Sequence, residues 1–215
     1  MKRIVALAFL VTMIAATGGA EERPAVHLLL TTAPGVTAAA RIAMTREATQ
    51  IWSRAGVRLN WVSPTTRPAG LSPRVLTVEH TGPAAASNHA VLGELVRGAG
   101  TGAVAMIAID RASAIAVRGS LSRGSLSFDE RLGLVLGRAL AHEIGHFLLA
   151  GLPHQLTGLM RASFPEHELV DPWSPTFEVT AETKAVALRT VKNGLPSRIP
   201  ALAIPAATAT SDATD

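Results

Sequence analysis

Apolar residues recur at helical spacing in three stretches of the chain, and each stretch ends at or just before a glycine. The first stretch covers residues 35–56, the second covers 129–150, and the third covers 179–194. Ser127 or Asp129 can cap the start of the second helix, because their side-chain oxygens accept hydrogen bonds from free backbone N–H groups. The pattern therefore predicts three helices.

Shorter segments predict strands, because they are either apolar throughout or alternate between apolar and polar residues. Four such segments are present: 25–32, 57–62, 74–80 and 103–110. Residues 81–102 are loop-like and could include one short helical turn or an edge strand. The Gly/Ser-rich character of residues 111–130 predicts a long loop that could include one strand.

The order of these elements is strand, helix, several strands, helix, loop and helix. This order is typical of an α+β fold. We expect a mixed, twisted β-sheet packed on the N-terminal helix and on the second helix, followed by a small C-terminal helical subdomain.

The first 20 residues have the form of a secretory signal peptide. Lys2 and Arg3 precede a short apolar run, residues 4–16, and small residues then lead to a cleavage site at Ala20. The apolar run is shorter than the ~20 residues that a membrane-spanning helix needs. We therefore expect cleavage, no stable membrane insertion afterwards, and export to the periplasm or the extracellular space.

Residues 21–194 are then expected to form one domain, and residues 195–215, rich in Ala, Pro and Thr, a flexible tail. Cleavage also removes two basic residues, Lys2 and Arg3, which lowers the formal net charge from +4 to +2. This charge is too weak to indicate a nucleic-acid partner. The chain has no cysteine, so disulfides and thiolate metal ligands are excluded.

One apolar segment, ALAHEIGHFLLAGLPHQLTGLM at residues 139–160, contains three histidines and one glutamate. Buried polar groups are costly unless something satisfies them, and a shared metal would do so. His142 and His146 are one helical turn apart on the same face, where two imidazoles can bind one zinc ion at ~2.0–2.1 Å. Glu143 lies about 100° around the helix from His142. This position suits a general base that acts on a water at the metal.

A catalytic zinc usually has three protein ligands and one open position, so a third ligand is needed. His154 is the nearest candidate, because Gly151 would end the helix and Pro153 would prevent it from restarting. The alternative is a carboxylate from an acidic cluster further along the chain: Glu166, Glu168 or Asp171.

The segment resembles the zinc metallopeptidases of the zincin class, and most closely the metzincins, whose pattern is H-E-x-x-H-x-x-G-x-x-H followed by a methionine turn. The resemblance implies a zincin-like fold and one catalytic Zn²⁺. By residue, it implies zinc ligands at His142, His146 and His154, a general base at Glu143, a turn glycine at Gly151 and a turn methionine at Met160. In this chain the glycine follows the second histidine by five residues instead of three, and the methionine follows the third histidine after only six.

The predicted function is that of an exported zinc-dependent peptidase, similar to a metalloendopeptidase, which cleaves a peptide or protein substrate with a zinc-activated water. We expect the strand near Ala103 to Ile109 to form the upper rim of the cleft and to pair with an extended peptide. An alternative is a non-catalytic zinc-binding or structural protein, in which Glu166 or Glu168 closes the site as a fourth ligand. A further alternative is hydrolysis of a non-peptide substrate.

Other large or titratable side chains have simpler interpretations. Trp52, Trp61 and Met106 are predicted to lie in the core. Trp173 is also interpreted as a core residue, with a position over the site as the alternative. The remaining histidines are interpreted as ordinary surface or loop residues: His27, His80, His89 and His167.

Overall fold

The computed structural model of the chain describes residues 24–32, 35–62, 76–81, 92–97, 103–119, 126–149 and 152–193. The predicted signal peptide (residues 1–20) and tail (residues 195–215) lie outside the described residues, as does Gly151. No helix in the described ranges is long and apolar enough to cross a membrane.

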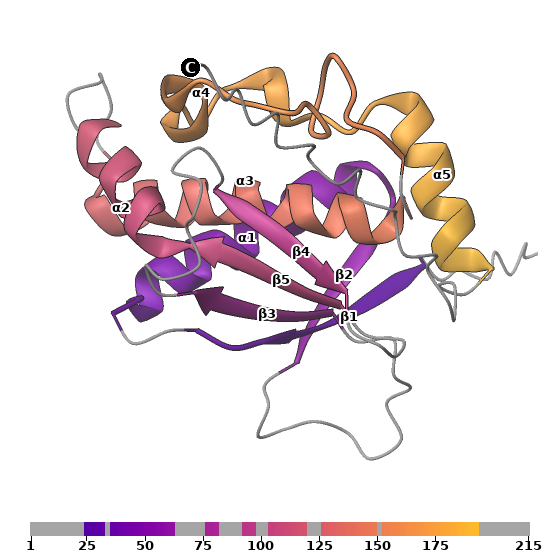
Figure 1. Ribbon diagram of the computed structural model, residues 1–215, viewed down its shortest axis with the longest axis horizontal. Helices are drawn as coiled ribbons and strands as arrows, with labels where there is room; N and C mark the ends of the chain where they lie inside the picture. The colour runs from indigo at the N-terminus through magenta and orange to yellow at the C-terminus, as the bar shows by residue number, and fades with distance from the viewer. Residues whose placement is uncertain are drawn as a thin grey trace, which may run out of the picture.

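Within these described ranges, five strands form one mixed sheet in the order β2-β1-β3-β5-β4 (Figure 1). The pairs β1–β2, β1–β3 and β3–β5 are parallel, whereas β4 runs antiparallel to β5 and forms one edge of the sheet. The strands are β1 (Ala25–Leu30), β2 (Arg58–Val62), β3 (Leu76–Thr81), β4 (Gly93–Arg97) and β5 (Ala103–Ala108).

The strand predicted as the upper rim, near Ala103 to Ile109, is not an edge strand. β5 is paired with β3 on one side and with β4 on the other, so its backbone hydrogen-bonding groups are already used. The segment 81–102, for which an edge strand was one of two alternatives, supplies β4 and covers this position. The rim prediction is therefore wrong, because the added antiparallel strand moves the free edge to Gly93–Arg97.

Two helices, α1 (Ala38–Arg54) and α3 (Phe128–Leu148), pack against each other on the same side of the sheet (Figure 1). Ser127, not Asp129, caps α3: its hydroxyl accepts from the Glu130 N–H, and the Glu130 side chain accepts from the Ser127 N–H. α1 is followed by Gly56, whose φ of 83° is readily adopted only by glycine. The helices expected in these two regions are thus present.

A helix, α2 (Ile109–Arg118), occupies the first part of the segment that was predicted to be a loop. Its buried residues, Ala112, Ile115 and Ala116, recur at helical spacing. Over the whole segment 111–130, this helical spacing is obscured by the Gly/Ser-rich residues that follow. The loop prediction is wrong for this half of the segment.

α3 is buried on almost every side, because it lies between the sheet and the C-terminal segment (Figure 1). That segment contains α4 (Glu166–Val170), a 3-10 turn η4 (Pro175–Phe177) and α5 (Ala181–Lys192). The contact between α3 and α1 depends on Gly133, where a Cβ atom would lie 2.3 Å from the Ala43 Cβ and 2.8 Å from the Ala40 carbonyl oxygen. A side chain at this position would therefore push the two helices apart.

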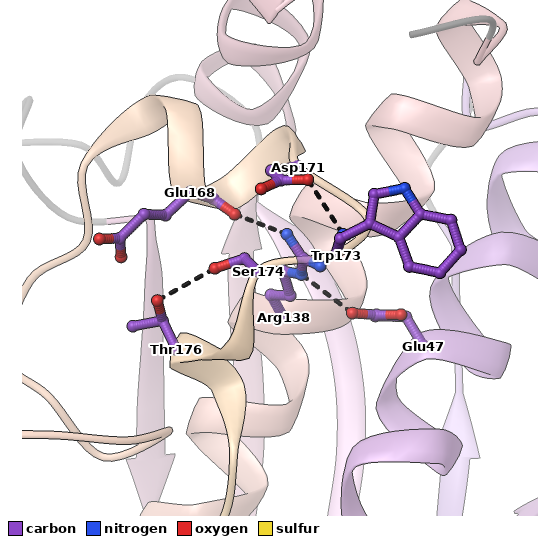
Figure 2. A network of polar contacts seen from close by, with 7 residues as sticks. All are labelled: Glu47, Arg138, Glu168, Asp171, Trp173, Ser174 and Thr176. Carbon is purple, nitrogen blue, oxygen red and sulfur yellow. Dashed lines mark hydrogen bonds and ion pairs between the residues drawn. The ribbon is translucent and has the colours of Figure 1, made fainter.

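The aromatic side chains divide into a buried and an exposed group. Trp52 is fully buried, as predicted, and its indole N–H donates to the Ala141 carbonyl oxygen at 3.0 Å. Trp61 and Met106 are half-buried. Trp173 is 87 % exposed, so the core interpretation is wrong: it lies in a turn in which its backbone N–H donates to the Asp171 carboxylate (Figure 2). Of the other histidines, His27 is half-buried and His167 is exposed.

Candidate metal centre

Three histidine side chains converge at the C-terminal half of α3. The Nε2 atom of His146 lies 3.0 Å from the Nε2 atom of His142 and 3.1 Å from that of His154. One ligand atom from each of the three side chains can be chosen so that all lie within 4.8 Å of one another. Nitrogen atoms that bind one tetrahedral zinc at ~2.0–2.1 Å are about 3.4 Å apart, so these separations are close to those that zinc requires.

The protonation state of His142 follows from its hydrogen bond. Its Nδ1 atom lies 2.7 Å from the Leu159 carbonyl oxygen, which can only accept, so Nδ1 carries the proton. In the neutral ring, Nε2 then has a free lone pair directed at the other two histidines. Burial lowers the pKa of His142, which favours this neutral form. A second ring nitrogen held by a carbonyl is the usual arrangement of a metal-binding histidine.

His154 reaches the helix histidines because the chain after α3 turns back and is held at several points. The Gln155 N–H donates to the Met160 carbonyl oxygen at 2.8 Å, and the Leu159 N–H donates to the Glu178 carbonyl oxygen at 2.8 Å. The turn passes through Gly158, whose φ is 74°. These bonds fix both the loop that carries His154 and the carbonyl that orients His142.

Met160 lies against α3 beside the two histidine-bearing turns. It is 1 % exposed, and a Cβ atom at Gly145 would lie only 2.2 Å from its sulfur atom. The absence of a side chain at Gly145 therefore makes room for the methionine. Met160, the turn methionine implied by the resemblance, is thus buried against the helix that carries His142 and His146.

The acidic cluster that was the alternative source of a third ligand faces other partners. The Glu166 carboxylate forms two hydrogen bonds with Arg118, at 2.7 and 2.6 Å. Glu168 forms an ion pair with Arg161, and Asp171 accepts a backbone N–H two residues later. Within the described ranges, the candidate metal group consists of the three histidines alone.

Glu143 projects from α3 toward the edge strand β4 and is 4 % exposed. Its carboxyl group lies against Gly93, where a Cβ atom would be 2.8 Å from the Glu143 Oε1 atom. Among the described residues, its side chain has no hydrogen-bond or ion-pair partner. Burial raises the pKa of Glu143 to about 8, and the nearby Glu94 adds to this rise. A cation bound to the histidines would oppose the shift and favour the carboxylate.

A cavity of about 780 Å³ opens beside these four side chains. Its lining includes residues 92–95, at the start of the edge strand, and residues 161–164. Phe164 lies edge-on to the His142 ring, with ring centroids 6.1 Å apart, and stacks on Phe177 at 4.8 Å. The cavity therefore joins the histidine cluster to an aromatic wall and to a strand with a free edge.

The four polar residues that converge here were candidates from the sequence, whereas the residues around them were not. The aromatic wall of Phe164 and Phe177 had no signal in the sequence, because Phe164 lies outside the helices and strands and Phe177 ends a turn of only three residues. Gly93 had a weak signal, since an isolated glycine in a strand often marks the close approach of another group. That signal could be used only if residues 93–97 were already recognised as a strand.

Comparisons with known proteins gave a match among solved structures only. No protein family model matches the chain, and no curated protein matches it. Among solved structures, the chain is similar to archaemetzincin from Methanopyrus kandleri, with 17 % sequence identity and a TM-score of 0.47. The similarity covers 80 % of this chain and 99 % of that protein. Because a TM-score below 0.5 is too low to transfer an activity, the metal-binding hypothesis rests on the histidine geometry.

Proposed function

We propose that the chain is an exported zinc-dependent peptidase, with His142, His146 and His154 as the zinc ligands and Glu143 as the general base. The observation that carries the proposal is the convergence of three imidazole nitrogens beside a buried carboxyl group. Zinc is the metal that best suits three neutral imidazoles and an open fourth position. The structure also supports a neutral His142 with its Nε2 atom free to bind.

When bound, zinc would lower the pKa of a coordinated water and polarise the carbonyl group of the substrate. Glu143 would accept the proton of that water and then donate it to the leaving amine. Its burial keeps the carboxyl group away from bulk water, and Gly93 confines it on the strand side. The three histidines hold the reacting centre in place, and the Leu159 carbonyl orients one of them.

The edge strand supports a peptide as the substrate. Among the strands that the structure describes, β4 pairs only with β5, and residues 92–95 line the cavity next to Glu143. An extended peptide can add to such an edge through backbone hydrogen bonds, which would place one of its carbonyl groups near the histidines. The peptide would thus bind along Gly93–Arg97 instead of along the strand that the sequence predicted.

The alternative of a closed, non-catalytic zinc site has no comparable support. It requires Glu166 or Glu168 as a fourth ligand, and these carboxylates form ion pairs with Arg118 and Arg161. The hypothesis of a non-catalytic zinc site would be favoured if the zinc-loaded chain cleaves no peptide in a broad library.

Zinc analysis of the purified chain and of matched variants tests the ligand set. We expect about one zinc ion per chain in the wild type and in the control Glu166→Ala/Glu168→Ala, because these two carboxylates lie outside the histidine group. His154→Ala should lose most of its zinc, because two imidazoles are an incomplete site. The opposite result, with zinc kept by His154→Ala and lost from the double variant, would move the third ligand to the acidic cluster.

Cleavage of a quenched fluorescent peptide library tests the activity. The zinc-loaded wild type should cleave a subset of the peptides, a zinc chelator should stop the reaction, and added zinc should restore it. A chain that binds one zinc ion but cleaves no peptide would contradict the peptidase proposal.

Export is proposed from the first 20 residues. The chain recovered from the periplasm or the medium of an expressing cell should begin at Glu21, as N-terminal sequencing can establish. A recovered chain that still begins at Met1 would contradict the cleavage, and a chain found only in the cytoplasm would contradict export.

A further inference from the structure

The edge strand β4 begins with a glycine whose backbone does not require one. Its φ lies outside the left-handed region in which glycine is favoured, and it pairs in regular antiparallel register with Ile107. Glycine in a strand is unfavourable, because it loses more conformational entropy on folding and provides no side chain to pack. The reason for Gly93 must therefore be found in its surroundings.

Those surroundings consist mainly of the Glu143 side chain. A Cβ atom at position 93 would lie 2.8 Å from the Glu143 Oε1 atom, 3.1 Å from its Cγ atom and 3.0 Å from the Ile107 Cδ1 atom. The Ile107 atom is the end of a flexible side chain and can move by a small rotation. The Glu143 side chain is 4 % exposed and lines the cavity beside the histidines, so a Cβ atom at position 93 would move its carboxyl group away from the strand.

We propose that Gly93 is a positioning residue for Glu143: the missing side chain leaves the space in which the carboxyl group is held beside the histidine cluster. The catalytic consequence rests on the proposed peptidase function, whereas the contact itself does not. His142 and His146 on α3 and His154 on the loop that follows surround one side of the reacting centre, and the edge strand limits the position of the base. A methyl group at position 93 would displace the carboxyl group, and the three heavy atoms nearest to it belong to Glu143 and Ile107 and not to an imidazole.

The kinetic test compares Gly93→Ala with Gly133→Ala. In Gly93→Ala we expect kcat to fall about 10–100-fold, because a displacement of about 1 Å at a catalytic group has effects of this size. KM and the zinc content should stay close to the wild-type values. Gly133→Ala is the control: its Cβ atom clashes with α1, so the melting temperature should fall by roughly 2–12 °C while kcat stays unchanged.

A thermal double-mutant cycle tests the contact without any activity. The single changes Gly93→Ala and Glu143→Ala are compared with the double variant, all as metal-free protein. If the two side chains compete for one space, the change in melting temperature caused by Gly93→Ala should be more positive in the Glu143→Ala background than in the wild type. The expected difference is about 2–8 °C.

The possible outcomes separate this inference from the proposed function. A lower kcat together with thermal coupling supports both. An unchanged kcat overturns the positioning role. If KM rises while kcat is unchanged, the glycine makes room for the substrate. If neither changes, the glycine serves only the packing of the fold. Additive melting temperatures overturn the contact. If the zinc-loaded wild type cleaves no peptide, the peptidase proposal fails, and the thermal cycle alone decides whether Gly93 sets the position of Glu143.

Discussion

Glu143→Gln should reduce kcat by about 10²–10⁴-fold while the chain keeps one zinc ion. The amide has nearly the same shape as the carboxyl group, so it can occupy the same space against Gly93. It cannot accept a proton, however, and the loss of a general base has effects of this size. The measurement is the steady-state cleavage of a peptide that the wild type hydrolyses, with zinc content determined on the same samples.

Glu166→Gln is the matched control for this change. Glu166 lines the same cavity, but its carboxylate is bound to Arg118, away from the histidine group. We expect its kcat to stay within a few-fold of the wild-type value, because the lost ion pair is exposed and weak. If Glu143→Gln retains wild-type turnover with zinc bound, Glu143 is not the base and the mechanism is wrong.

Arg138→Met should lower the free energy of unfolding by about 3–5 kcal/mol, the largest stability effect that we expect from a single substitution. Arg138 is 2 % exposed, and its Nε–H donates to the Glu47 carboxylate at 2.9 Å (Figure 2). A second N–H donates to the Glu168 carbonyl oxygen at 2.6 Å, and the guanidinium lies 4.4 Å from the centroid of the Phe177 ring. Removal of the arginine would leave a largely buried carboxylate and a carbonyl oxygen without these partners.

Two further variants test this explanation by urea denaturation. Arg118→Met breaks an arginine–glutamate pair whose side chains are 55 % and 45 % exposed, so it should change the free energy of unfolding far less than Arg138→Met does. Glu47→Leu combined with Arg138→Met should recover part of the loss, because it removes the unpaired charge as well. Equal effects of Arg118→Met and Arg138→Met would show that burial does not determine the strength of these pairs.

The network of Arg138 also explains how the C-terminal segment is attached to the rest of the protein. Glu47 is on α1, Arg138 is on α3, and the Glu168 carbonyl belongs to α4 (Figure 2). One side chain thus joins two helices of the main layer to the segment that follows the histidine loop. No pattern in the sequence pairs these residues, because their partners are 91 and 30 positions away.

The spacing of apolar residues predicted helices and strands correctly where the pattern extended over the whole element. The helices α1, α3 and α5 and the strands β1, β2, β3 and β5 were predicted because their apolar positions are continuous or recur at a regular spacing. α2 was missed, since ten helical residues were followed directly by a Gly/Ser-rich stretch. The order of the strands in the sheet could not be predicted either, because pairing between distant segments depends on the packing of the whole chain.

The sequence by itself determined the relation of His142, Glu143 and His146, because helix geometry is local and places residues four apart on one face. Only the tertiary structure decided which downstream side chain meets them: the turn held by Met160 and Glu178 brings His154 to the helix, while arginines bind Glu166 and Glu168. It also decided that β4 forms the free edge and that Gly93 faces Glu143. These contacts join segments far apart in the chain, and their geometry depends on how the sheet and helices pack, so local spacing could not predict them.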